Sequence, residues 1–190
     1  MGKHSRTLKT LRDIALEYGS TEQPDLASMA RELGRVVHEH APALANRLAP
    51  LRARQRGFER WLLAERSKPA LSVLVMAWPP NHLTPVHDHA GLWGLEVALA
   101  GALEVQSYTR DPASGDLRMQ GRDWLGPGDG TWIEGDENQH DGSQRVGEPA
   151  PIACVSVHHR NDQRRRHGRR DQSDALCEQL HESQTVFSQC

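Results

Sequence analysis

The feature that most constrains the fold is a series of short β-like runs, separated by Gly and Pro, that begins near residue 70. The runs cover residues 71–78, 93–100, 103–109, 130–134 and 152–159. The segments between them contain PPNH, DPASGD and GPGDG, which are turn and loop sequences. No helical periodicity intervenes, so we predict a mainly β protein built as a small sandwich or barrel.

Before this β-rich region, residues 7–48 show the three- and four-residue apolar spacing of amphipathic helices, with a break at residues 19–24. Asp25 follows Pro24 and suits the first turn of the second helix. At about 150 residues per domain, the length predicts one main domain. We expect a helical segment at 1–57 packed on a barrel at 58–160, followed by a basic extension at 161–190.

Composition excludes several classes of protein. Lys and Arg number 23 and Asp and Glu 25, for a net charge of −2, so a generally basic nucleic-acid binder is not expected. No apolar run is long enough to span a membrane, and the N-terminus lacks a secretory signal pattern. The three cysteines form no disulfide framework, which favours a reducing cytoplasm.

Residues 160–170 contain six arginines and one aspartate. We interpret them as a solvated extension, and they give the only hint of an anionic partner.

Three histidines stand beside glycines and short apolar alternations. Alternate residues of a strand point to the same side, so His87 and His89 direct two imidazoles into one space. Imidazole is a good ligand for Fe, Zn, Cu and Ni, and a third convergent donor would complete a site for a first-row metal. A third histidine, His140, ends the Gly-containing stretch 128–140. Metal is therefore the first functional hypothesis.

The spacing H-x-H-x4-G-x6-G from His87, followed by G-x11-H ending at His140, resembles the two metal motifs of the cupin superfamily. Most cupins place a ligating Glu where this chain has Gly94, and its loss is a feature of the thiol dioxygenases, which include cysteine dioxygenase. Residues 58–63 resemble that family's Tyr-x-Arg-x-Leu segment. Residues 156–158, Ser-Val-His, resemble its Ser-x-His pair.

The resemblance implies a cupin-type small β-barrel, or double-stranded β-helix, with an N-terminal helical segment. It also implies Fe(2+) bound by His87, His89 and His140, and oxidation of a small thiol carboxylic acid by O2 to its sulfinic acid. Cysteine is the favoured substrate, because the cysteine-specific members carry Arg at the position of Arg60. 3-Mercaptopropionate and mercaptosuccinate remain open.

Each remaining site residue has a functional and a structural interpretation. Arg60 would bind the substrate carboxylate in a bidentate contact, or it is a surface arginine where helix meets strand. Ser156 and His158 share a strand face, so Ser156 would orient a His158 ring beside the metal. The alternative is that His158 is a buried structural histidine.

Arg160 stands where the family has Tyr, so the Cys–Tyr crosslink of animal members cannot form.

Glu96 lies two residues after Gly94 and therefore on the same strand face. A buried carboxylate is costly unless it is paired or ligating. Glu96 is thus a fourth metal ligand of a different cupin enzyme, a group behind the ligands, or a side chain turned outward at a bulge. A non-catalytic metal- or ligand-binding cupin with a basic docking tail is a further alternative. Trp93 and Trp132 are expected to pack in the barrel.

Overall fold

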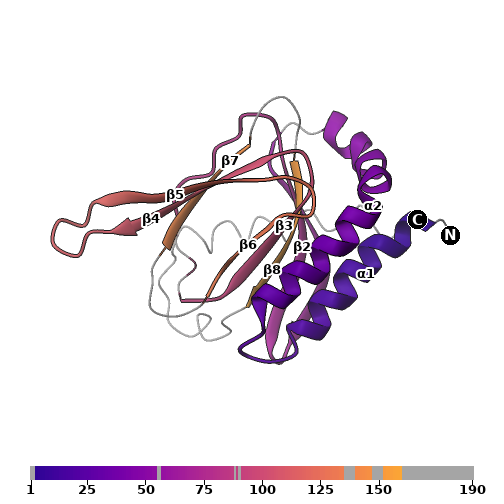
Figure 1. Ribbon diagram of the computed structural model, residues 1–190, viewed down its shortest axis with the longest axis horizontal. Helices are drawn as coiled ribbons and strands as arrows, with labels where there is room; N and C mark the ends of the chain where they lie inside the picture. The colour runs from indigo at the N-terminus through magenta and orange to yellow at the C-terminus, as the bar shows by residue number, and fades with distance from the viewer. Residues whose placement is uncertain are drawn as a thin grey trace. The chain divides into compact units, whose positions relative to one another are not determined.

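The computed structural model describes the backbone of residues 3–54, 57–87, 89, 91–134, 140–146 and 152–159. Side chains are described for 6–46, 48–49, 57–87, 89, 91–134 and 154–158. All of these residues belong to one compact unit, Met1–Arg160. Figure 1 shows the elements, which are α1 (Lys3–Tyr18), α2 (Leu26–Arg54), β1 (Glu59–Ser67), β2 (Ala70–Trp78), β3 (Gly94–Ala100), β4 (Leu103–Arg110), β5 (Leu117–Leu125), β6 (Gly130–Ile133), β7 (His140–Val146) and β8 (Ile152–His159).

The predicted helical segment is confirmed, with the break between the two helices at residues 19–25. Asp25 caps α2, because its carboxylate accepts hydrogen bonds from the Ser28 backbone N–H at 2.9 Å and from the Ser28 hydroxyl at 2.6 Å. Such a cap satisfies backbone donors that have no partner within the helix. The cap explains why α2 begins directly after Asp25.

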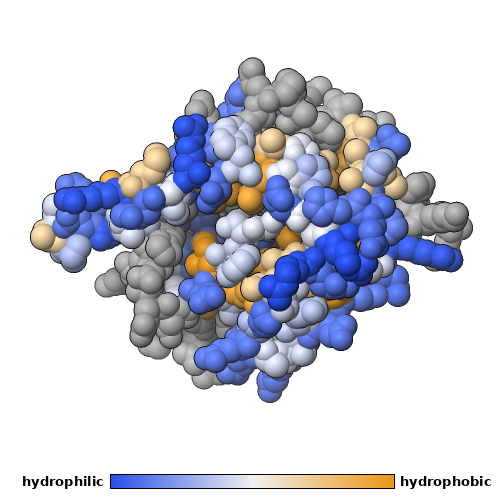
Figure 2. Space-filling model, viewed as in Figure 1, coloured by the Kyte–Doolittle hydropathy of each residue, from blue (hydrophilic) through white to orange (hydrophobic). Residues whose placement is uncertain are grey.

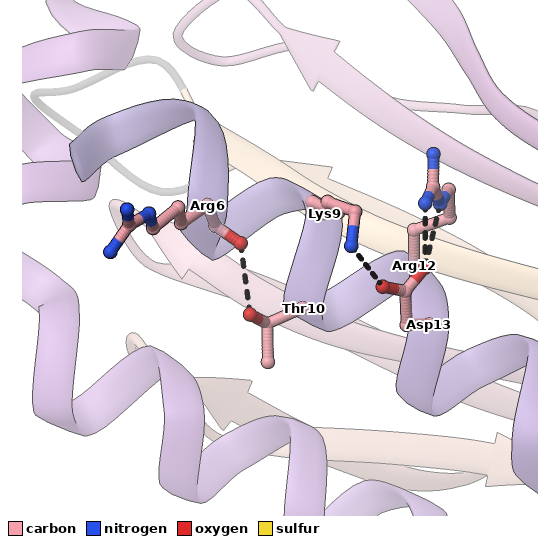
Figure 3. A network of polar contacts seen from close by, with 5 residues as sticks. All are labelled: Arg6, Lys9, Thr10, Arg12 and Asp13. Atoms are coloured by element: carbon pink, nitrogen blue, oxygen red, sulfur yellow. Dashed lines mark hydrogen bonds and ion pairs between the residues drawn. The ribbon is translucent and has the colours of Figure 1, made fainter. Parts of the chain in front are cut away.

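The solvent-facing side of α1 carries a small network of polar contacts (Figure 3). Arg12 donates two hydrogen bonds to the Asp13 carboxylate, at 2.9 and 2.7 Å, and Lys9 lies 3.2 Å from it. These contacts lower the pKa of Asp13, and the contact with Arg12 contributes most to the shift. Exposed ion pairs of this kind contribute little stability. Figure 2 shows a largely hydrophilic surface over the helices, whereas Leu11 and Ala15 on the opposite side of α1 are fully buried.

Two antiparallel sheets make up the β region. The larger has the strand order β1-β2-β8-β3-β6 and the smaller the order β5-β4-β7. The chain passes from β3 in the larger sheet to β4 and β5 in the smaller one. It then returns to the larger sheet at β6, crosses again at β7 and ends in the larger sheet at β8. This alternation between two sheets is the connectivity of a double-sheet jelly roll, the architecture of cupins. The predicted mainly β, cupin-type fold with N-terminal helices is confirmed.

The two faces of the larger sheet have different roles. One face packs on the helices through buried side chains that include Leu71, Val73, Leu95, Val97, Val155 and Val157. The other face points toward the smaller sheet, where a second apolar cluster joins Met76, Trp78, Ala98, Leu103, Leu125 and Cys154. Toward one end of β8 and β3, the side chains on this inner face are polar instead of apolar. The candidate site lies at that end.

The strands β1, β5 and β7 were not predicted from the sequence. β5 is exposed along most of its length, and Met119 is 54% exposed. It is held by its backbone register with β4, from Leu103 opposite Leu125 to Arg110 opposite Leu117. A strand stabilised in this way needs no apolar alternation, which is why the hydrophobic periodicity of the sequence did not predict β5.

Among the described residues, no helix is both long and apolar enough to cross a membrane.

Candidate metal and substrate site

A cavity of about 250 Å³ lies between the two sheets. Its size fits a small molecule better than a drug-sized ligand. The described residues that line it are His87, His89, Gly94, Glu96, Val105, Gln106, Ser107, Asp123, Thr131, Trp132, Ile133 and His158. Thus two of the predicted metal ligands meet in one space with His158 and with Glu96, whose role the sequence left open.

His87 and His89 enter the cavity from the loop before β3, with ring centroids 5.4 Å apart. The Nδ1 of His87 donates a hydrogen bond to the Pro85 carbonyl at 2.9 Å. In a neutral imidazole with the proton on Nδ1, Nε2 is the nitrogen that can accept a hydrogen bond or bind a metal. The loop backbone therefore orients the His87 ring.

His158 reaches the same cavity from β8. Its ring is stacked on that of His89, with centroids 5.9 Å apart and an interplanar angle of 26°. Its Nε2 shares a hydrogen bond with the hydroxyl of Ser156, which is fully buried. Burial, reinforced by the charges of His89, Arg60 and His87, lowers the pKa of His158 to about 3. The ring is therefore neutral at physiological pH.

Gly94 makes room for this pair of rings. A Cβ at position 94 would lie 2.9 Å from Nδ1 of His158 and 3.4 Å from Nδ1 of His89. The first distance is shorter than side-chain carbons tolerate, and a packed imidazole has little freedom to withdraw. The absence of a side chain at Gly94 is therefore a requirement of the histidine arrangement.

Glu96 lines the cavity and is only 8% exposed. Its register partners on the neighbouring strands are Ser156 and Thr131. The interpretation that Glu96 turns outward is therefore wrong, because the regular pairing of β3 keeps its side chain on the inner face. The nearby Cys154 thiol is fully buried, and burial, with the charge of Glu96, raises its pKa well above the ordinary value.

Arg60 lies on β1, opposite Met76 of β2. Its guanidinium stacks over the Phe58 ring, 4.9 Å from the centroid, and the side chain is partly buried. Its charge contributes to the lowered pKa of His158. Arg60 is not among the described residues that line the cavity. The structure thus places its charge within electrostatic reach of His158 but does not make it a cavity wall.

Several predicted features lie outside the described part of the chain. His140 begins β7 with its backbone opposite Thr109, but its side chain is not described. Arg160 and the basic segment 160–170 are also outside the described residues. Among the side chains that are described, no three His, Cys, Asp or Glu form a group that could hold a metal. A third ligand from His140 stays a prediction.

Other wall residues were missed or misjudged from the sequence. Trp93 is buried against the helix-facing core, as expected, whereas Trp132 is 40% exposed and borders the cavity. The packing prediction for Trp132 is wrong because it stands on β6, at the edge of its sheet. Asp123 and Ser107 went unnoticed. Asp123 lies on β5, which has no strand pattern in the sequence.

No protein-family model matches the chain. Similar solved structures include a Cupin_2 domain of an XRE family transcriptional regulator from Enterobacter cloacae, 18% identical, with a TM-score of 0.40, covering 56% of this chain and 99% of that one. KdgF from a Halomonas species is 19% identical, with a TM-score of 0.41 and coverage of 58% and 86%. An oxalate oxidase in complex with glycolate is 15% identical, with a TM-score of 0.42 and coverage of 54% and 51%. The fold assignment rests on the strand connectivity itself.

Proposed function

We propose that the protein is an iron-dependent thiol dioxygenase, which converts R–SH and O2 to R–SO2H with both oxygen atoms bonded to sulfur. One observation carries the proposal. The neutral ring of His158, hydrogen-bonded to Ser156, lies in the same cavity as His87 and His89, at the place that Gly94 leaves open. The Gly at position 94 and the Ser-x-His pair are also among the residues on which the family resemblance depends.

Two of the three proposed iron ligands, His87 and His89, line this cavity, and the third, His140, has its backbone on β7. His87, His89 and His140 would hold Fe(2+), and imidazole nitrogen is a ligand that suits this ion. The hydrogen bond from His87 to Pro85 already fixes the tautomer that ligation requires. When bound, the iron would supply an acidifying site for the thiol and the redox capacity to activate O2.

The remaining groups would act on the substrate and on each other. The His158 ring stays neutral, so it adds no positive charge beside a cation, and Ser156 fixes its orientation. Arg60 would bind the carboxylate of a thiol carboxylic acid, because a guanidinium can contact both carboxylate oxygens. Its electrostatic effect on His158 supports this role, since that effect requires proximity.

The test is oxygen uptake by the iron-loaded protein with a panel of thiols. We expect one O2 consumed for each sulfinate formed, and loss of uptake in His89→Ala. His40→Ala is the matched control, because His40 is exposed on α2 and does not line the cavity. Absence of thiol-dependent uptake, or uptake that His89→Ala leaves intact, would contradict the proposal.

A second candidate is a cupin enzyme of another class that uses Glu96 as a fourth metal ligand. The burial of Glu96 in the cavity wall favours it. Iron content after Glu96→Gln separates the two candidates. A thiol dioxygenase with three histidine ligands keeps about one iron for each chain, because this substitution leaves its ligands intact. Loss of the metal in this variant would support the second candidate.

A further inference from the structure

One edge of β5 has no strand beside it in the described part of the chain. The smaller sheet has the order β5-β4-β7, so β5 is its last strand and only its other edge pairs with β4. β5 is nine residues long and contains no Lys or Pro, the residue types that natural proteins place on edge strands to prevent pairing. Figure 1 shows that the β4–β5 hairpin projects away from α1 and α2. Within the described structure, the free edge of β5 is therefore open to pairing with another strand.

β5 also carries exposed apolar side chains. Leu117 is 39% exposed, Met119 54% and Trp124 53%. These three are among the seven large hydrophobic residues that are exposed in the described part of the chain. Figure 2 shows apolar residues among hydrophilic ones on the projecting hairpin. Exposed apolar side chains that gather on one element indicate a contact surface.

A β-bulge in β5 decides which of its side chains share a face. Gly121 is opposite Ser107 and Met119 is opposite Tyr108, so Gln120 is an extra residue without a register partner on β4. The simple alternation of side chains along a strand is therefore interrupted at this position. The faces of β5 follow instead from its partners on the regular strand β4.

Leu117 and Trp124 lie on the same face of the hairpin. They are opposite Arg110 and Glu104, which are an even number of positions apart on β4 and so point to the same side. Without the bulge, the odd number of positions between Leu117 and Trp124 would put them on opposite faces. The bulge thus places an exposed leucine and an exposed tryptophan on one face, one on each side of it.

Arg118 and Asp123 lie on the other face. They are opposite Thr109 and Val105, which also point to one side of β4. The Arg118 side chain is 71% exposed, although it pairs with Asp111 at 2.7 Å. Asp123 is exposed as well, and within the described part of the chain it forms no hydrogen bond or ion pair. A positive and a negative side chain thus stand on one face of the same edge strand.

We infer that β5 is the interface of a homodimer, in which it pairs antiparallel with β5 of a second copy about a two-fold axis at the bulge. This register sets Leu117 opposite Trp124 of the partner subunit, and the axis repeats the pair. It also sets Arg118 opposite Asp123 of the partner subunit, again twice. Each pair joins side chains on the same face, as direct cross-strand contact requires. One strand thus supplies both members of an apolar pair and of an opposite-charge pair.

A shift of this register by one residue destroys the match. It would set Arg118 opposite Arg122 or Trp124 of the partner subunit, and both of these side chains stand on the other face. A bulge usually hinders pairing at a sheet edge. Here the bulge aligns the faces only when the second strand carries the same bulge, so it favours a second copy of β5 over the strand of another protein.

Charge exchange tests the interface. We expect wild-type protein to be a dimer in sedimentation equilibrium of the full chain. Arg118→Asp sets two carboxylates opposite each other at both pairs, so it should raise the dissociation constant of the dimer at least about tenfold. The double variant Arg118→Asp/Asp123→Arg should recover the dimer. It restores opposite charges between the subunits but not the contact of residue 118 with Asp111. Arg31→Asp is the matched control, because Arg31 is exposed on α2.

A disulfide tests the register without relying on charge. Directly opposed residues of an antiparallel pair lie close enough for a disulfide. In a background with Cys177→Ser and Cys190→Ser, oxidation of Leu117→Cys/Trp124→Cys should link two chains, whereas neither single variant should. Cys154 is buried and can stay. Within one chain, positions 117 and 124 are too far apart along the strand to be joined.

A monomeric wild-type protein would overturn the inference, as would a dimer whose dissociation constant Arg118→Asp leaves unchanged. A dimer that Arg118→Asp weakens, but that neither the double charge variant recovers nor the cysteine pair links, has its contact elsewhere and overturns the inference too. A monomer whose β5 amides are protected from hydrogen exchange would mean that another segment of this chain covers the edge.

Discussion

The Nε2 of His158 shares a hydrogen bond with the Oγ of Ser156, two residues earlier on β8. The two side chains meet because alternate residues of a strand point to the same side. Ser156 is buried in the larger sheet between β2 and β3, so the hydroxyl has a fixed position. The contact therefore fixes how the ring of His158 faces the cavity.

Removal of this hydroxyl should impair activity more than stability. We expect Ser156→Ala to lower kcat/KM for the thiol substrate by about 10- to 100-fold, the usual effect of losing a partner that orients a ring near a metal. Ser114→Ala, in the exposed β4–β5 turn, should leave kcat/KM unchanged. Steady-state oxygen uptake and thermal unfolding of both variants provide the measurement. An unchanged kcat/KM in Ser156→Ala would show that the hydrogen bond has no functional role.

Gly94 should tolerate no side chain. A methyl group there would lie 2.9 Å from the His158 ring, so Gly94→Ala forces that ring or β3 to move. Overpacking of this kind costs about 1–3 kcal/mol of the free energy of unfolding. Gly57→Ala is the control, because a Cβ at Gly57 meets no atom within 4 Å. Chemical denaturation measures both, and equal stability of the two variants would contradict the crowding that the structure shows.

The low pKa of His158 predicts that stability depends on pH. The imidazole titrates near its ordinary value of 6.5 in the unfolded chain and at about 3 in the folded protein. Between these values the unfolded state binds the extra proton, so the stability is full above pH 6.5 and falls as pH decreases toward 3. One proton corresponds to about 1.4 kcal/mol for each pH unit.

His158→Gln removes this titration. Metal-free wild-type protein should therefore lose stability between about pH 6 and 4 more steeply than His158→Gln, by about 1.4 kcal/mol for each pH unit. Urea denaturation at a series of pH values measures both slopes. Parallel curves for the two proteins would mean that His158 titrates normally in the folded state.

Local sequence patterns were sufficient to predict the fold and part of the candidate site. Apolar spacing located the helices, and the runs at 71–78, 93–100 and 152–159 match β2, β3 and β8 closely because those strands are buried. The i,i+2 rule placed Ser156 beside His158 on β8. The rings of His87 and His89 also lie close together, as predicted, but they come from a loop and not from the strand on which that prediction was based. These are properties of one segment at a time.

Contacts between distant segments could not be predicted in the same way. Asp123, an exposed residue, borders the cavity only because β5 pairs with β4 in one register, and neither the strand nor the register has an apolar signature. The requirement for glycine at position 94 depends on a ring carried by β8, far along the chain. Glu96 faces inward because β6 and β8 both pair regularly with β3.

The most direct test of the account is the iron content of single histidine variants after anaerobic loading with Fe(2+) and gel filtration. His87, His89 and His140 are proposed as ligands, whereas His158, although stacked on His89, is proposed to remain unligated. We predict about one iron for each chain in wild-type protein and in His158→Ala, and loss of iron in His87→Ala, His89→Ala and His140→Ala. Iron retained by His140→Ala together with iron lost from His158→Ala would contradict the account.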